Sequence, residues 1–216
     1  MNKMKKFALI AVCAALLVCV TIGATVAWLT STDKVENTFT VGKVKITLDE
    51  ADVNEEGLAL NTVGEPLGTD GNLTPAERVR ENDYHLLPGC VYVKDPTVHV
   101  EAGSEACWVF VKVENGLAGI EGDPLIAKQI TDNDWTALGE GYDGIYYRLV
   151  EKQTTAQDFT VFDNFRVKDA ATNTELSNYA GARVKVTAYA IQFANFDSPA
   201  EQVWEDSGFA TPTTGA

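Results

Sequence analysis

Four acidic side chains gather in one short stretch of the sequence, which reads DNDWTALGEGYD. They are Asp132, Asp134, Glu140 and Asp143. Carboxylate oxygens are the hard ligands that calcium prefers. The stretch departs from the helical calcium-loop template, because glycine is missing at its sixth position and glutamate at its twelfth. The sequence therefore offers a candidate calcium site, with an ordinary acidic turn as the simpler interpretation.

Catalytic motifs are scarce in the sequence. The only histidines, His85 and His99, stand apart, and there is no His-Glu-x-x-His motif. A catalytic zinc site usually takes three protein ligands, often histidines. The Gly-x-Ser-x-Gly motif of serine hydrolases is also missing. Cys107 falls on an apolar strand pattern, which is typical of a small core residue. We predict no catalytic residues, no enzymatic activity and no cofactor other than the candidate calcium ion.

Aromatic residues cluster close to the acidic stretch. Trp135, Tyr142, Tyr146 and Tyr147 could form a platform on which sugar rings stack. The cores and turns of β-sandwiches use aromatic residues as well. A carbohydrate-binding or ligand-binding module is therefore an alternative function to be weighed.

The N-terminus has the form of an export signal. Lys3, Lys5 and Lys6 make a basic region, and an apolar run follows from Phe7 to Val20. The run is about 14 residues long, whereas a helix that crosses a membrane needs about 20. This length favours a signal peptide that is removed over a permanent membrane anchor.

A cleavage site follows the apolar run. Thr25 and Ala27 are small residues at the −3 and −1 positions, so cleavage would make Trp28 the new N-terminus. A retained signal anchor is one alternative. A lipoprotein attached at Cys19 is another, although Val18 is bulky where a small residue is expected.

Cleavage would make an acidic protein more acidic. It removes three lysines and leaves 14 basic against 31 acidic side chains, a formal charge of −17. Nucleic acids and anionic membranes need basic patches on a partner, so the charge disfavours both. We expect contact with a membrane only through the signal peptide during export. The charge itself fits either a soluble secreted protein or one that binds cations or partners.

Several runs of residues alternate between apolar and polar, or are apolar throughout, and these runs predict a chain made mostly of strands. One run, 107–114, is apolar on both faces and must be covered on both sides. The longest and most apolar run, 182–193, is predicted to be a central strand. These features predict an all-β, antiparallel β-sandwich. The predicted strands are 39–48, 91–100, 107–114, 144–150, 159–167 and 182–193.

Two or three short helices are expected in the connections. TPAE, which starts at Thr74, has the residues of a capping box and predicts a helix to about Asn82. SPAE, which starts at Ser198, predicts a second helix through Trp204.

The mature chain is long enough for one domain. Residues 28–216 are expected to form a single β-sandwich domain after a signal peptide of residues 1–27. An acidic, glycine-rich loop and the first helix form an insertion at about 51–89. Cys90 and Cys107 are the mature chain's cysteines. A simple hairpin would hold them too far apart for a disulfide, whereas strands in different sheets would leave their separation open.

The stretch from Ala24 to Glu50 resembles a known family. ATVAWLTSTDKVENTFTVGKVKITLDE is similar to the export and first-strand pattern of Gram-positive proteins processed by the signal peptidase SipW, which include TasA and camelysin. Looser similarity extends to PGCVYVKDPTVHVEAGSEACWVFVKVE, IYYRLVEK and VKVTAYAIQFANF. The matching residues are Ala27, Trp28, Asn37, Thr38, Phe39, Gly42, Val44, Ile46 and Leu48.

The resemblance implies a jelly-roll-like sandwich that is secreted and serves an extracellular biofilm matrix. It implies self-assembly or co-assembly with related subunits, with Trp28 and Leu29 donated as a strand to a neighbouring subunit. The signal peptidase would be a partner during export. A metalloendopeptidase activity of the camelysin type is a weaker implication, because no residues here would carry it. The insertion at about 51–89 departs from the short first connection that the family pattern leads us to expect.

Replacing Ala27 with proline or with a bulky residue should block processing, because the peptidase requires a small side chain at −1. N-terminal sequencing of the secreted wild-type protein should start at Trp28. A start at Met1, or at a lipid-modified Cys19, would contradict the prediction.

Overall fold

The computed structural model describes residues 43–58, 77–152, 154–193 and 198–209. All of them belong to one unit, Gly42–Ala216. The cleavage residues Thr25, Ala27 and Trp28 and the donor residue Leu29 lie outside the described residues. The cleavage and donor-strand interpretations therefore stay predictions.

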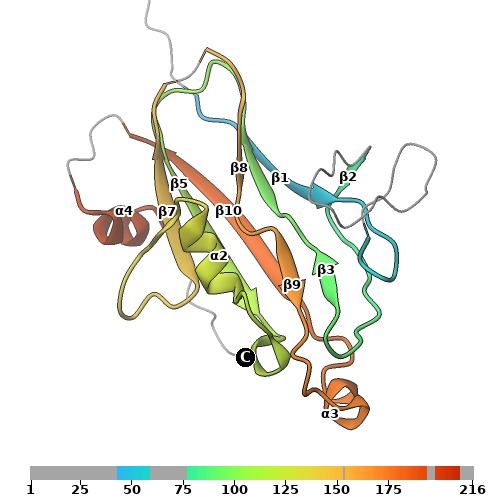
Figure 1. Cartoon of the computed structure of the whole chain (residues 1–216). Coiled ribbons are helices and arrows are strands. Elements are labelled where there is room, and N and C mark those ends of the chain that lie inside the picture. Colours follow the sequence, from blue (N-terminus) through green and yellow to red (C-terminus); the bar gives the residue numbers. More distant parts are fainter. Residues whose placement is uncertain (1–42, 59–76, 153, 194–197, 210–216) are drawn as a thin grey trace, which may run out of the picture. The chain divides into compact units, whose positions relative to one another are not determined.

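The described residues form antiparallel sheets (Figure 1). The first sheet has the order β2-β1-β4-β8, and a two-stranded sheet pairs β3 with β9. Every strand pairing is antiparallel, which confirms the all-β, antiparallel sandwich predicted from the sequence. The strands are β1 (Ile46–Ala51), β2 (Arg78–Val79), β3 (Val91–Val93), β4 (Thr97–Val100), β8 (Gln157–Thr160) and β9 (Asn164–Arg166).

The second four-stranded sheet holds the longest strands. Its order is β10-β5-β7-β6, and β5 and β10 pair without interruption over nine residues. The strands are β5 (Cys107–Asn115), β6 (Thr136–Ala137), β7 (Ile145–Val150) and β10 (Val184–Gln192).

Short helices occupy the connections, as predicted. The terminal helix α4 (Ala200–Asp206) was expected, but it begins after Pro199 without a side-chain cap. The 3₁₀ helix η1 (Ala118–Ile120) and helices α2 (Ile126–Asp132) and α3 (Asn173–Ser177) had no clear sequence signal. Within the described ranges, no helix is both long and apolar enough to cross a membrane.

The helix predicted from Thr74 to Asn82 is wrong for the part that the structure describes. Arg78 and Val79 form β2 and pair with Ala51 and Glu50 of β1. The Arg78 guanidinium bonds the carboxylates of Asp49 and Asp95, the latter at 3.0 Å. Backbone pairing and these charged hydrogen bonds outweigh the local helix signal.

Two predicted strands are each divided in the structure. The run 91–100 breaks between β3 and β4, where Pro96 lacks the N–H that a continuous strand would donate. The run 159–167 breaks opposite, between β8 and β9, and the Val161 N–H donates to the Pro96 carbonyl at 2.8 Å. One proline therefore divides both strands at the same level.

The prediction that 182–193 is a central strand is also wrong. In the described sheet, β10 lies at the edge and β5 lies between β10 and β7. The prediction that 107–114 is covered on both faces is confirmed, since Cys107 to Val111 are all buried. Apolar composition alone cannot distinguish a central strand from an edge strand whose faces are partly covered.

The two cysteines that the structure describes, Cys90 and Cys107, are free. The hairpin considered for residues 91–113 does not form, because β4 and β5 belong to different sheets. Cys107 is fully buried between the sheets and Cys90 is half-buried.

Two hydrophobic clusters lie on opposite faces of β5. The inner one joins the two sheets and includes Val98 and Val100 of β4 with Val109 and Val111 of β5. The outer one packs Phe110 against Trp204 of α4. Helix α4 therefore covers the outer face of the second sheet.

Phe110→Ala should lower the free energy of unfolding by about 3–5 kcal/mol, because it leaves a cavity among buried aromatic rings. The ring is fully buried and contacts Trp108, Tyr147, Trp204 and Phe209. Urea denaturation measures the change. Leu149→Ala, at a position 53% exposed on the adjacent strand, is the control and should change it by less than about 1 kcal/mol. Equal losses in the two variants would contradict the assigned core.

Candidate docking groove

One side of the sandwich is closed by side chains that bridge the sheets. The Trp135 indole N–H donates to the Thr160 carbonyl of β8 at 2.9 Å. The Arg148 guanidinium of β7 lies 4.1 Å from the centre of the Phe159 ring, also on β8. Trp135, just before β6, and Arg148 on β7 thus join the second sheet to β8.

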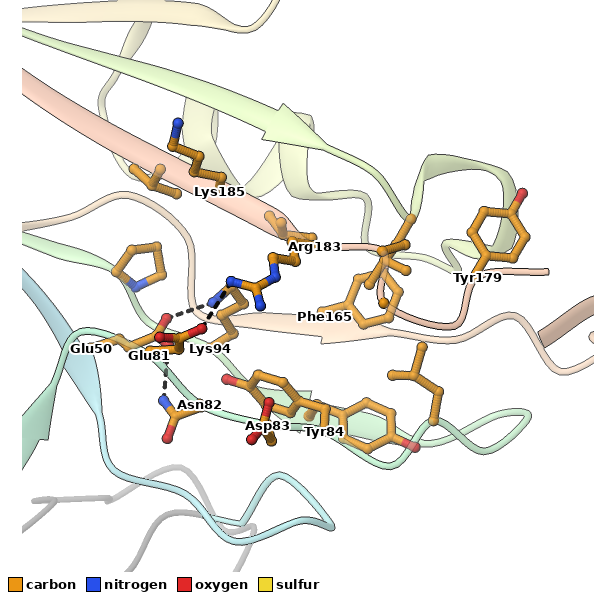
Figure 2. Close-up of a pocket in the computed structure, with 18 of the residues that line it drawn as sticks. Glu50, Glu81, Asn82, Asp83, Tyr84, Lys94, Phe165, Tyr179, Arg183 and Lys185 are labelled. Atoms are coloured by element: carbon orange, nitrogen blue, oxygen red, sulfur yellow. Dashed lines mark hydrogen bonds and ion pairs between the residues drawn. The ribbon is translucent and has the colours of Figure 1, made fainter. Parts of the chain in front are cut away.

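The opposite side, between β1 and β10, holds a groove of about 860 Å³ (Figure 2). Charged residues stand along its two rims. The rim on the side of β1 carries Glu50, Glu81 and Asp83, and the rim on the side of β10 carries Arg183 and Lys185. The apolar part of the lining includes Leu48, Leu86, Leu117, Phe165, Leu176, Val184 and Val186.

Exposure along β10 shows that its open edge is incompletely covered. From Val186 to Gln192 every residue is half-buried, whereas Cys107 to Val111 of the neighbouring β5 are buried without exception. The difference follows from pairing, because β10 has a neighbour on one side only in the described sheet.

Both faces of β10 carry apolar side chains. Val186, Ala188 and Ala190 pack against the inner cluster. Tyr189 and Ile191 pack against the outer cluster under α4. A strand added at this edge would therefore meet apolar surface on both of its own faces.

The usual protections of an edge strand are weak here. Exposed edges are commonly blunted by charges, proline or a bulge. The β10 sequence, VKVTAYAIQ, has one charged residue, Lys185, and no proline. Its pairing with β5 is continuous, so no bulge twists the edge away. This edge is the strongest candidate for a docking surface among the described strands.

The β1 rim of the groove is held by a network of polar contacts. The Asn82 side chain donates to the Glu50 carboxylate and to the Ala51 carbonyl, both at 2.9 Å. Lys94 completes the cluster with an ion pair to Glu50 at 2.6 Å. The Tyr84 hydroxyl donates to the Val93 carbonyl at 3.1 Å, and burial raises the pKa of that hydroxyl. The rim is therefore preformed.

A charged clasp joins the strands behind this rim. His99 of β4 bonds Asp49 of β1 through Nε2 at 2.8 Å and Asp158 of β8 through Nδ1 at 2.6 Å. Burial alone would lower the pKa of His99, but the hydrogen bonds to the two carboxylates outweigh it and raise the pKa. Burial alone would raise the pKa of Asp49, but Arg78 and His99 lower it. The clasp therefore favours a charged imidazolium between two carboxylates.

The four residues of the candidate calcium site lie in different segments of the structure. Asp132 ends α2 and pairs with Lys128 at 2.5 Å. Asp134 follows with a left-handed backbone, and Glu140 and Asp143 lie in the connection from β6 to β7. Within the described ranges, no group of three or more acidic, histidine or cysteine side chains could hold a metal ion. The calcium interpretation gains no geometric support.

The aromatic residues near that stretch do not form an exposed platform. Trp135 and Tyr146 are buried, at 2% and 9% exposure. Tyr142 is instead bonded through its hydroxyl to Glu205.

Burial raises the pKa of the Cys107 thiol to about 11, which fits the core residue predicted from the sequence.

Sequence reasoning missed the groove. It found the β10 run but placed it centrally, and it treated the rim residues 80–86 as part of a helix and turn. The clasp histidine was correctly placed in a strand, but its carboxylate partners lie 50 and 59 residues away in the chain. No local signal could reveal those pairings.

In comparisons with known proteins, no protein-family model, no curated protein and no solved structure matches the chain. The groove and the β10 edge must therefore be interpreted from their own geometry.

The clasp makes stability depend on pH. Because the folded pKa of His99 is raised, its contribution is full below about pH 6.5 and is lost as the pH rises through the folded pKa. Because the folded pKa of Asp49 is lowered, its contribution is full above about pH 4, the unfolded value, and is lost as the pH falls through the folded pKa, which lies below that. Melting temperatures measured from pH 4 to pH 9 should show the decline at the alkaline end.

His99→Gln should flatten that alkaline decline. The control is His85→Gln, since the His85 side chain bonds no carboxylate in the described structure. An unchanged pH profile in His99→Gln would show that the clasp does not contribute.

Proposed function

We propose that the protein is a secreted structural subunit that assembles with copies of itself or with related subunits in an extracellular matrix. The observation that carries this proposal is the open, apolar edge of β10 beside the groove. An exposed edge strand of this length is a template for another chain. An extended segment can add to such an edge, with backbone hydrogen bonds for affinity and side-chain pockets for specificity.

The proposed occupant is the N-terminal segment of a second copy, beginning at Trp28. Adjacent residues in a strand point to opposite faces. Trp28 and Leu29 therefore present one large apolar side chain to each face, which suits an edge that is apolar on both. The family resemblance supports the same arrangement.

Export would control the timing of assembly. Before cleavage the segment is continuous with the signal peptide, so its end is not free to enter a neighbouring groove. Cleavage after Ala27 would release it. Pairing of residues 28–32 within their own domain is the competing arrangement, and the tests below distinguish the two.

A ligand-binding module for cell-surface polysaccharide is the second candidate. Tyr84 and Tyr179 in the lining of the groove favour it, because aromatic rings and charged rims suit sugars. A glycan array probed with mature protein would support this candidate if binding occurred and were lost in Tyr179→Ala. Electron microscopy of the same preparation would show whether fibres form.

Trp28→Ala, or deletion of residues 28–32, should weaken self-association by about 30- to 160-fold, because burying a tryptophan contributes about 2–3 kcal/mol. The melting temperature of the monomer should barely change. Sedimentation velocity and calorimetry on the mature protein measure the two effects. Normal assembly of the variant, or a monomer destabilised by several kcal/mol, would assign the segment to its own domain.

Hydrogen–deuterium exchange tests the acceptor edge directly. Amides in 184–192 should exchange more slowly in the assembled protein than in the monomer, because docking pairs the open edge. The β8 strand, Gln157–Thr160, is the matched control, since it also lies at a sheet edge. Slowing at β8 and not at β10 would place the interface elsewhere.

A further inference from the structure

A single ion pair joins the two rims of the groove in the described part of the chain. Arg183, just before β10, lies with its Nη1 atom 2.9 Å from Oε1 of Glu81 on the opposite rim (Figure 2). The two residues are 102 positions apart in the chain. The contact therefore crosses the mouth of the groove and adds nothing to the pairing within either rim.

Neighbouring charges on the rims are paired differently. Lys94 pairs with Glu50 on the β1 rim at 2.6 Å. Lys185 lies 3.5 Å from Glu114 on β5, within the second sheet. Loss of Glu81 would thus leave Arg183 without an ion-pair partner among the described residues, and the β1 rim would keep its own contacts.

The Arg183 backbone is anchored by a contact that does not involve its side chain. Its carbonyl accepts a hydrogen bond from the Gly116 N–H at 2.9 Å, which anchors the start of β10 to the end of β5. The side chain alone reaches across the groove. A strand docking along Val184 and Val186 would occupy the space that this side chain crosses.

Exposure makes the contact easy to break. The side chains of Arg183 and Glu81 are 77% and 70% exposed. An exposed pair changes an equilibrium by about fivefold at most, and salt screens it further. Such a pair can adjust how often the groove is open, but it cannot lock the groove shut.

We propose that the Arg183–Glu81 ion pair is a latch across the mouth of the groove, which must open before a strand of a second copy docks. This inference rests on the proposed function, because it assigns a regulation to the same site. Assembly should therefore be faster when salt, or the loss of either charge, weakens the ion pair.

The test follows assembly of the mature protein by light scattering. At low salt, Glu81→Gln should assemble about two to five times faster than wild type, whereas near 0.5 M salt the two rates should converge, as screening removes the pair. The double exchange Glu81→Arg with Arg183→Glu restores the pair and should return the wild-type rate. Asp169→Asn, which breaks an exposed pair with Arg166 outside the lining of the groove, is the control and should leave the rate unchanged.

A covalent latch provides the second measurement. In a Cys90→Ser background, Glu81→Cys with Arg183→Cys can be joined by a short bismaleimide, and the joined monomer should not dock a second copy. Equal rates for Glu81→Gln and wild type at low salt, a slower rate for Glu81→Gln, or normal assembly of the joined protein would each overturn the latch. Failure of the wild-type protein to assemble at all would instead overturn the proposed function.

Discussion

The nine-residue pairing of β5 with β10 is the interaction on which the rest of the structure depends. It places β5 between two neighbours, so that both of its faces become core. The inner face meets Val98 and Val100 of the first sheet, and the outer face meets Trp204 of α4. The same pairing leaves the other edge of β10 open in the described chain. Stability and the candidate docking surface therefore arise from one strand pair.

Hydrogen bonds between charged side chains hold the first sheet together. Arg78 bonds Asp49 and Asp95, and these bonds keep β2 in the first sheet, although the local sequence alone favours a helix there. Asp49 also bonds His99, so the clasp and the Arg78 contact share one carboxylate. The rim facing β10 is held by several polar contacts, whereas the contact that crosses to Arg183 is a single exposed ion pair. Such an arrangement suits a groove whose walls persist while its mouth opens.

The two sides of the sandwich differ in a way that bears on function. Trp135 and Arg148 close one side by contacts to β8, using a buried hydrogen bond and a cation above a ring. The other side has apolar lining and charged rims but only one contact between the rims among the described residues. In the part of the chain that the structure describes, this side has apolar surface that a further strand would cover. That physical need links the proposed self-assembly to the fold more directly than any catalytic feature does.

By itself the sequence determined the class of the fold. Alternation and apolar runs located the regions of the described strands other than β2 and β6, and the burial of both faces of 107–114, because these depend on local pattern. The capping-box residues from Ser198 located the terminal helix. Tertiary structure decided which strand is central. The run 182–193 is apolar enough for a central or an edge position, and only its strand pairing shows that one edge of β10 is open in the described sheet. It also converted Arg78 and Val79 from predicted helix to strand, because bonds to Asp49 and Asp95 exceed a local propensity. The His99 clasp and the Arg183–Glu81 pair join residues 50 to 102 positions apart, and the groove joins β1 and β10, which lie still further apart in the chain. No local pattern encodes such distances.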